Sequence, residues 1–130
     1  MSFLLDSNIA IYLREGVVDI VRRVDGLPQK PFLCAITRVE LEGGVYADAD
    51  LRVRRRHAVD ALLLMLPMVD FDVEMSAVYG QILEKTGFNR RKIIDRMIAA
   101  TAIVSGMTLI TTNGADFDDI DGLDLEVWNL

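Results

Sequence analysis

The stretch Phe3-Leu4-Leu5-Asp6-Ser7-Asn8 passes within a few positions from an apolar run to an acid and then to residues that can begin a helix. The apolar run predicts a short buried strand, and the residues from Ser7 through Leu13 predict a helix. Asp6 therefore stands at the carboxyl end of the predicted strand. In a parallel α/β sheet these ends meet along one edge, where ligands bind.

Three more acids follow an apolar run or lie at the beginning of a helix. They are Glu40 in Thr37-Arg38-Val39-Glu40, Asp95 in Ile93-Ile94-Asp95-Arg96-Met97-Ile98, and Asp116 in Thr111-Thr112-Asn113-Gly114-Ala115-Asp116-Phe117. Four carboxylates at one edge of a sheet repel each other and remain ionised together only beside a cation. A metal-dependent hydrolase site is therefore our first hypothesis.

The rest of the chain alternates between strand-like and helix-like segments. Further strands are expected at Phe32–Ile36, Met68–Phe71, Thr108–Ile110 and, more weakly, Leu125–Trp128. Helices are expected at 17–25, from Thr37 to a weakening or end at Gly43-Gly44, at 49–66, from a cap at Asp72 to Lys85, and at 91–105. This order predicts an α/β fold with a parallel sheet and helices on both faces.

Length and composition limit the classes of protein to consider. With 130 residues, 52% of them apolar, the chain is expected to form one domain, residues 1–130, and not to be disordered. The most apolar stretch, Ala61–Val69, is too short to span a bilayer, so no membrane is expected. The single Cys34 allows no internal disulfide, and Asp6 comes too early for an export signal, which favours a cytoplasmic protein.

Each acid also has a purely structural interpretation. Thr37 and Glu40 have the spacing of a helix capping box, and Asp6 and Asp116 could complement helix dipoles. Asp95 is harder to explain in this way, because it shares a helix face with apolar residues and burial of an unpaired carboxylate is costly. It needs a partner, which could be Arg91, Lys92 or a metal ion.

Other chemistries find less support in the sequence. The only histidine, His57, lies in an arginine run on a predicted helix, so Ser7 is not a convincing triad nucleophile. There is no Cys/His cluster for zinc and no phosphate-binding glycine loop. A phospho-receiver would need its acceptor at a strand end, whereas Asp60 falls in a helix. A haloacid-dehalogenase-like phosphatase would need an acid where Asn8 stands.

Two basic clusters are candidates for binding phosphate groups. Arg52, Arg55 and Arg56 lie on the side of a predicted helix away from its apolar face, and a solvated face is their default interpretation. The second cluster is closer to the proposed site, because it lies one turn before Asp95. Its members are Arg90, Arg91 and Lys92. Basic residues there could draw a phosphate-bearing substrate toward a pocket that its own acids make repulsive.

Together the motifs resemble those of PIN-domain ribonucleases, specifically the VapC toxin family of type II toxin–antitoxin systems. The resemblance rests on Leu5-Asp6-Ser7-Asn8, Thr37-x-x-Glu40, Asp95 with Ile98-Ala99-Ala100, Thr111-x-Asn113-x-x-Asp116-Phe117 and the tail Gly122-Leu123-x-Leu125-x-x-Trp128. It implies the PIN-domain three-layer α/β/α fold, with a central, mainly parallel sheet of four to five strands. The basic residues before Asp95 depart from the usual pattern, which bears on substrate preference.

The resemblance also implies roles for individual residues. Asp6, Asp95 and Asp116 would bind Mg²⁺ or Mn²⁺, and Glu40 would act from the outer shell or on a second ion. Asn8, Thr111 and Asn113 would support the carboxylates and waters by hydrogen bonds. The expected function is a metal-dependent endoribonuclease toxin that is neutralised by a cognate antitoxin.

The resemblance further implies a homodimer, which could assemble further with the antitoxin. Two alternatives remain open at this point. The chain could be an RNA-processing nuclease outside a toxin–antitoxin pair, or a catalytically idle PIN interaction module.

Overall fold

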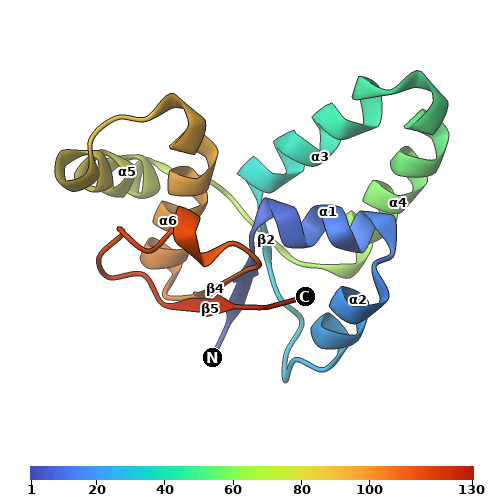
Figure 1. The fold of residues 1–130 in the computed structure, drawn as a ribbon, viewed down its shortest axis with the longest axis horizontal. Coiled ribbons are helices and arrows are strands. Elements are labelled where there is room, and N and C mark those ends of the chain that lie inside the picture. The colour runs from blue at the N-terminus through green and yellow to red at the C-terminus, as the bar shows by residue number, and fades with distance from the viewer.

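The computed structural model describes all residues, 1–130, and centres on a parallel sheet (Figure 1). The strands are β1 (Phe3–Leu5), β2 (Leu33–Cys34), β3 (Met68–Val69), β4 (Thr108–Thr111) and β5 (Leu125–Val127). Ladders join β1, β4 and β5 into one sheet and β2 and β3 into another, and every pairing is parallel. A parallel bridge from Leu4 to Phe32 connects the two sheets, which gives the strand order β3-β2-β1-β4-β5.

Six α-helices and three short 3₁₀ helices connect the strands. The α-helices are α1 (Ser7–Glu15), α2 (Val18–Asp25), α3 (Ala35–Ala47), α4 (Arg52–Met65), α5 (Val73–Thr86) and α6 (Ile93–Ser105). The 3₁₀ helices are η1 (Ala49–Leu51), η2 (Arg90–Lys92) and η3 (Gly114–Asp116). None of these helices combines the length and the apolarity that crossing a bilayer requires.

The helices form two layers, one on each face of the sheet. Residues of α1 to α4 pack with Phe3 and Leu5 of β1, whereas residues of α5 and α6 pack with Leu4, which points to the opposite face. Figure 1 shows α1 to α4 grouped on one side of the strands and α5 and α6 on the other. The predicted three-layer α/β/α fold is confirmed. Its five strands, however, are divided between two sheets that a single bridge connects.

The start of α3 differs from the prediction in a way that bears on the site. The expected strand at Phe32–Ile36 is short, because its partner β3 has only two residues, and Cys34 is already the residue that caps α3. Thr37 is therefore inside the first turn of α3 and is fully buried. Its hydroxyl contacts Ser7 Oγ at 3.1 Å and no side chain caps the helix, so the capping-box interpretation of Thr37 and Glu40 is wrong.

A weakening or end of this helix was expected at Gly43-Gly44, but α3 continues past both glycines to Ala47. Gly44 has a packing role: a Cβ atom at this position would lie 2.6 Å from Nη1 of Arg14, whose side chain is only 7% exposed. Gly43 has no such neighbour, because a Cβ atom there would have nothing within 4 Å. The glycine pair therefore permits a close approach of α1 to α3 at one position only.

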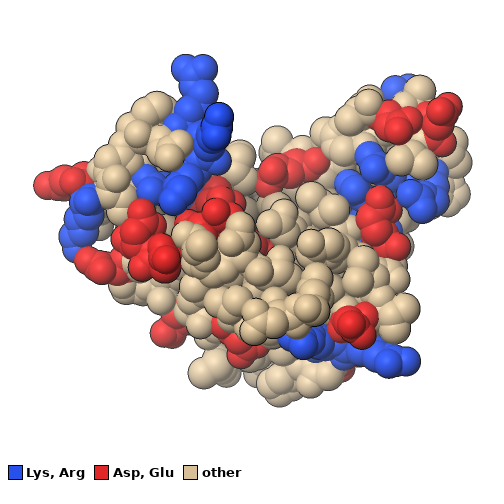
Figure 2. All heavy atoms as spheres, in the orientation of Figure 1, with Lys and Arg blue, Asp and Glu red and all other residues tan.

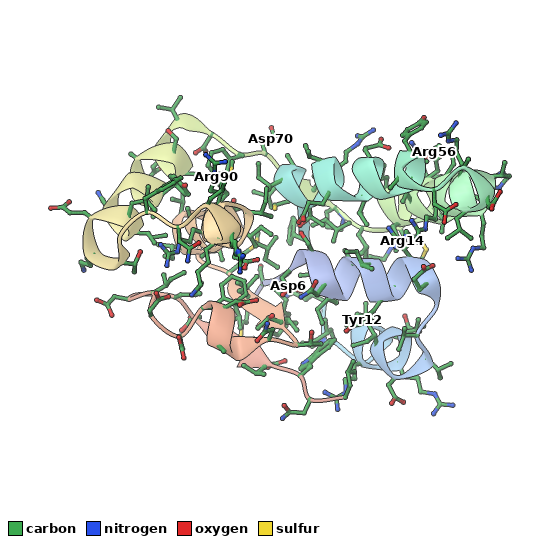
Figure 3. All side chains as sticks on the ribbon, turned by 45° about the horizontal axis from the view of Figure 1, so that its top comes forward. Asp6, Tyr12, Arg14, Arg56, Asp70 and Arg90 are labelled. Atoms are coloured by element: carbon green, nitrogen blue, oxygen red, sulfur yellow. The ribbon has the colours of Figure 1, made fainter.

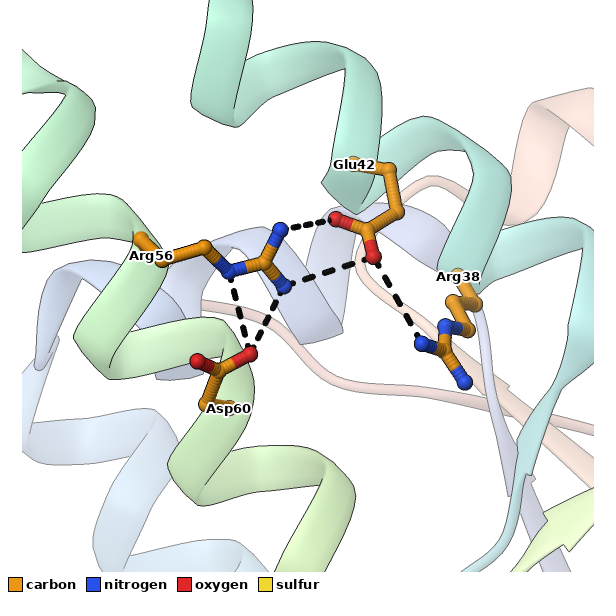
Figure 4. Close-up of polar contacts among 4 residues, drawn as sticks. All are labelled: Arg38, Glu42, Arg56 and Asp60. Carbon is orange, nitrogen blue, oxygen red and sulfur yellow. Dashed lines mark hydrogen bonds and ion pairs between the residues drawn. The ribbon is translucent and has the colours of Figure 1, made fainter.

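Two arginines of α4, Arg55 and Arg56, bind groups on neighbouring helices, whereas Arg52 is exposed as expected and lies over the ring of Tyr46. Arg55 donates to the carbonyl of Gly44 at 2.8 Å and lies 3.6 Å from Glu15. Arg56 binds both Glu42 of α3 and Asp60 of its own helix (Figure 4). These contacts lower the pKa of the Glu42 carboxyl and raise that of the Arg56 guanidinium. These two arginines thus stabilise the packing of α3 against α4, which makes them weak candidates for RNA contact.

We expect the two glycines of α3 to respond oppositely to alanine. Gly43→Ala should raise the free energy of unfolding by about 0.5–1 kcal/mol, because glycine in a helix interior costs backbone entropy. Gly44→Ala should be less stable than Gly43→Ala by about 1 kcal/mol, because the buried Arg14 guanidinium must move. Urea unfolding followed by circular dichroism measures both values. Equal gains for the two variants would contradict the packing role of Gly44.

Candidate metal-dependent hydrolase site

Asp6 is fixed by the pairing of β1 with β4. Its backbone N–H donates to Ile110 O at 3.0 Å, which continues the ladder by one residue past Leu5. One carboxylate oxygen accepts the N–H of Ile9 at 2.9 Å and so caps α1, and the other accepts the hydroxyl of Thr111. The dipole interpretation of Asp6 is therefore correct, but the same carboxylate is also held toward the end of β4.

The other three acids come from separate elements near the same edge. Glu40 lies on α3, Asp95 in the first turn of α6 and Asp116 at the end of η3. These acids are close enough to interact, since the negative charges of Asp116, Asp6 and Glu40 all raise the pKa of Asp95. Figure 3 shows Asp6 in the middle of the molecule, where α1 leaves the sheet.

Two of the four acids, Asp95 and Asp6, are held in an environment that disfavours their charged forms. The pKa of Asp95 is raised from 3.8 to about 6, first by burial and then by the negative charges of Asp116, Asp6 and Glu40. Burial also raises the pKa of Asp6, against the opposing hydrogen bonds from Thr111 and Ile9. Carboxyl groups with raised pKa values in one cluster are characteristic of functional sites.

None of the protein's own cations neutralises this cluster. Neither Arg91 nor Lys92 lies within ion-pair distance of Asp95, although the charge of Lys92 lowers the Asp95 pKa slightly. Oε1 of Glu40 is buried and has no hydrogen-bond partner. A buried carboxylate oxygen without a hydrogen-bond partner, beside three further acids, offers the oxygen ligands that a hard divalent cation prefers.

The carboxylates are not gathered closely enough for three of them to chelate one ion. Mg²⁺ takes only one or two carboxylates directly and keeps several waters, so closer convergence is not required for binding. The residues present therefore fit a divalent cation.

The predicted supporting residues divide into two groups. Thr111 is buried, donates to Asp6 and accepts the backbone N–H of Asn113 at 3.0 Å. The side-chain amide of Asn113 donates to Asp116 at 2.8 Å. Asn8 is exposed in the first turn of α1 and its side chain makes no hydrogen bond; its backbone N–H, not its side chain, lowers the pKa of the Asp6 carboxyl.

Two features of the site were missed by sequence reasoning. One is the hydroxyl pair of Ser7 and Thr37 under the acids, with Cys34 Sγ 3.6 Å from Thr37 Oγ1. The other is Arg96, which follows Asp95 directly and is only 2% exposed. An arginine within the apolar run of α6 was the signal that could have revealed a buried cation.

The basic cluster of η2 lies directly before Asp95. Arg90, Arg91 and Lys92 form no ion pair, and Arg90 and Arg91 are exposed. Figure 2 shows basic side chains over this part of the molecule, beside acidic side chains that lie between the two groups of helices. Positive charge that is not neutralised internally is thus available next to the acids. Figure 3 shows Arg90 near the start of α6.

Comparison with known proteins gives consistent matches along the chain. Residues 3–123 match the family described as PIN domain. The chain is 26% identical to the tRNA(fMet)-specific endonuclease VapC of Shigella flexneri over 132 residues, 99% of each chain. It is 29% identical to ribonuclease VapC2 of Rickettsia felis over 136 residues, again 99% of each.

Solved structures show the same likeness in three dimensions. The crystal structure of VapBC2 from Rickettsia felis bound to a DNA fragment from their promoter matches with a TM-score of 0.87 and 26% identity, over 99% of this chain and 100% of that one. DNA-bound VapBC from Salmonella typhimurium matches with a TM-score of 0.85 and 26% identity, over 98% of both chains.

The raised pKa of Asp95 predicts how stability changes with pH. Its pKa in the folded state, about 6, exceeds the ordinary 3.8. The stability that the protonated Asp95 contributes to the folded state is therefore fully present below pH 3.8 and is lost as the pH rises through 6. Asp95→Asn should therefore stabilise the metal-free protein at pH 7 by on the order of 1 kcal/mol and leave it unchanged at pH 4. Thermal unfolding in chelator at both pH values measures this. A stability difference between wild type and Asp95→Asn that does not depend on pH would show that burial and the neighbouring acids do not disfavour the charge of Asp95.

Proposed function

Because the chain belongs to the PIN domain family, we propose that it is a divalent-metal-dependent endoribonuclease and the toxin of a type II toxin–antitoxin pair. One observation carries the proposal: four separate elements bring Asp6, Glu40, Asp95 and Asp116 to one sheet edge, and no protein cation neutralises them. The curated relatives named as VapC endonuclease and ribonuclease support RNA as the substrate class.

The proposed direct ligands of Mg²⁺ or Mn²⁺ are Asp6 and Asp95, and Asp116 would bind the ion through a coordinated water. When bound, the ion supplies a water of lowered pKa and offsets the charge that develops on the phosphate. Glu40 would orient the attacking water and accept its proton, and its unpartnered Oε1 supports this role. Thr111 and Asn113 hold the carboxylates of Asp6 and Asp116 in position.

The basic cluster Arg90, Arg91 and Lys92 is proposed to bind the RNA backbone. These side chains are not engaged in internal ion pairs, in contrast to Arg55 and Arg56 of α4. Lysine and arginine bind phosphate without regard to base sequence, so this cluster would position the RNA without selecting the cleavage sequence.

The antitoxin is proposed to dock in an apolar groove between α1, α2 and α4. The groove has a volume of about 260 Å³, and one acid is its only polar wall residue. Its lining is Leu13, Val21, Val24, Asp25, Ala58, Ala61, Leu62, Met65 and Leu66. Leu64, next to it on α4, is 90% exposed. Such apolar surface is typical of a partner site, and the matched VapBC structures are toxin–antitoxin complexes.

A homodimer, which could be enlarged by the antitoxin, is the proposed assembly. Large apolar side chains outside the groove are available for a subunit contact, since Val39 is 65%, Val73 85% and Phe88 67% exposed. Light scattering of the purified toxin at micromolar concentration, with and without antitoxin, tests this assembly directly.

Cleavage of RNA tests the central proposal. Purified protein should degrade total RNA with Mg²⁺ or Mn²⁺ and not with chelator, and Asp6→Asn or Asp95→Asn should abolish cleavage because a metal ligand is lost. Glu40→Gln should also impair cleavage without lowering stability, since Glu40 caps no helix. Asp19→Asn, an exposed acid on α2, is the matched control and should retain full activity. Wild-type activity in Asp95→Asn would refute the site.

Inhibition by the antitoxin should involve the acids directly. A pocket of four carboxylates attracts a guanidinium, which can bridge two of them with paired hydrogen bonds. We therefore expect an antitoxin arginine or lysine to reach Asp6, Glu40, Asp95 or Asp116. Excess Mn²⁺ should weaken inhibition, and alanine in place of that residue should restore cleavage while the complex persists through the apolar groove. Inhibition that is insensitive to both changes would mean that the antitoxin only blocks access of RNA.

A further inference from the structure

Arg96 is a buried cation that the proposed chemistry does not use. It lies on α6 next to Asp95, and its side chain is only 3% exposed. The residues that follow it on α6, among them Ile98 and Ala99, belong to the apolar core. Burial of a guanidinium is costly unless its hydrogen bonds are replaced, so its partners have to account for its presence.

The terminal nitrogens of Arg96 bind two different segments. Nη1 donates to the carbonyl oxygen of Gly87 at 2.6 Å, and Nη2 donates to Oδ2 of Asp119 at 3.2 Å. Gly87 is nine residues before Arg96 and Asp119 is twenty-three residues after it. One side chain therefore connects α6 to two loops that are far apart in the sequence.

Each of these loops carries a proposed part of the site. Gly87 ends α5 and begins the connection to η2, which holds the basic cluster Arg90, Arg91 and Lys92. Asp119 follows η3 and stands three positions after Asp116. Arg96 itself is covalently next to Asp95. The contacts of one guanidinium thus link Asp95, Asp116 and the basic cluster.

Stability alone does not explain an arginine at this position. The side chain of Asp119 is 41% exposed, so water screens the ion pair from the acid's side. An apolar residue of similar volume could fill the position without desolvating a charge. What arginine adds is a planar, rigid fork that holds two acceptors at a fixed spacing.

Asp116 needs such a restraint. Its negative charge acts on both Asp6 and Asp95, so electrostatic repulsion favours its displacement outward. Its only side-chain hydrogen bond comes from Asn113 of the same turn, which moves with it. The contact from Arg96 to Asp119 ties the following residues to α6.

We propose that Arg96 is a positioning residue of the metal site, one that holds the Asp116 loop and the basic cluster in register with Asp95. The role of Arg96 in catalysis rests on the proposed function, but hydrogen exchange and metal affinity can test its positioning role without it. It assigns to Arg96 no contact with metal or RNA.

Four variants test the proposal. Arg96→Lys keeps the charge but loses the fork, Arg96→Met fills the volume without charge, and Asp119→Asn removes the ion pair from its more exposed side while keeping an oxygen that can accept from Nη2. Asp118→Asn, an exposed acid on the same loop without an ion pair, is the matched control. Hydrogen exchange without metal, Mn²⁺ affinity by calorimetry, and kcat and KM for RNA are measured well below each variant's Tm.

Positioning predicts faster exchange in residues 87–92 and 114–121 for both Arg96 variants, together with a Mn²⁺ affinity lower by about ten-fold. Asp119→Asn should show a smaller effect in the same direction, and Asp118→Asn none. Normal exchange of both loops in Arg96→Lys, or unchanged Mn²⁺ affinity in both Arg96 variants, would overturn the proposal. If the wild-type protein bound Mn²⁺ without cleaving RNA, the proposed function would fail, while the exchange and affinity data would still decide the role of Arg96.

Discussion

The parallel pairing of β1 with β4 is the interaction on which the site depends. It places Leu5 beside Ile110 and, one residue further, Asp6 beside Thr111. Because the register of a strand determines which side chains share a face, a shift by one residue would turn Asp6 away from Thr111 and bury apolar residues differently. The hydrogen bond between these two side chains thus depends on the same ladder that divides the core into its two halves.

Electrostatic repulsion among the acids sets the second constraint. Burial, and then the charges of the neighbouring acids, raise the pKa of Asp95, and burial raises that of Asp6. Keeping these two carboxyl groups beside two further acids lowers the stability of the folded chain, and the surrounding ladders, caps and buried hydroxyls offset this loss. The hydroxyl of Thr111 and the amide of Asn113 reduce this cost locally by donating to carboxylates.

The order of elements could be predicted from sequence because it follows from local patterns. Apolar runs before Asp6 and Asn113 indicated two central strands, and the helix ends expected at Lys85 and at residue 105 lie within one residue of those in the structure. The start of α3 could not be predicted, because it depends on the length of β3 and on a hydroxyl contact with Ser7, both distant in sequence. The same limit applies to Gly44, whose meaning lies in Arg14 of another helix. That the four acids come close could be anticipated from the sheet, whereas the tether through Arg96 could not, since both of its partners lie in irregular loops.

The double attachment of Asp6 has a consequence for how relatives of this chain are interpreted. One oxygen caps α1 and the other accepts from Thr111, so a residue that cannot cap α1 would destabilise the folded state whether or not the protein cleaves anything. Selection for folding alone would keep Asp6, or another capping residue such as asparagine, in a lineage that had abandoned catalysis. Glu40 and Asp95 make no such contribution, and their electrostatic cost would favour their replacement once activity was no longer required. Retention of these two acids, more than of Asp6, is therefore the informative sign of a working nuclease among sequences of this kind.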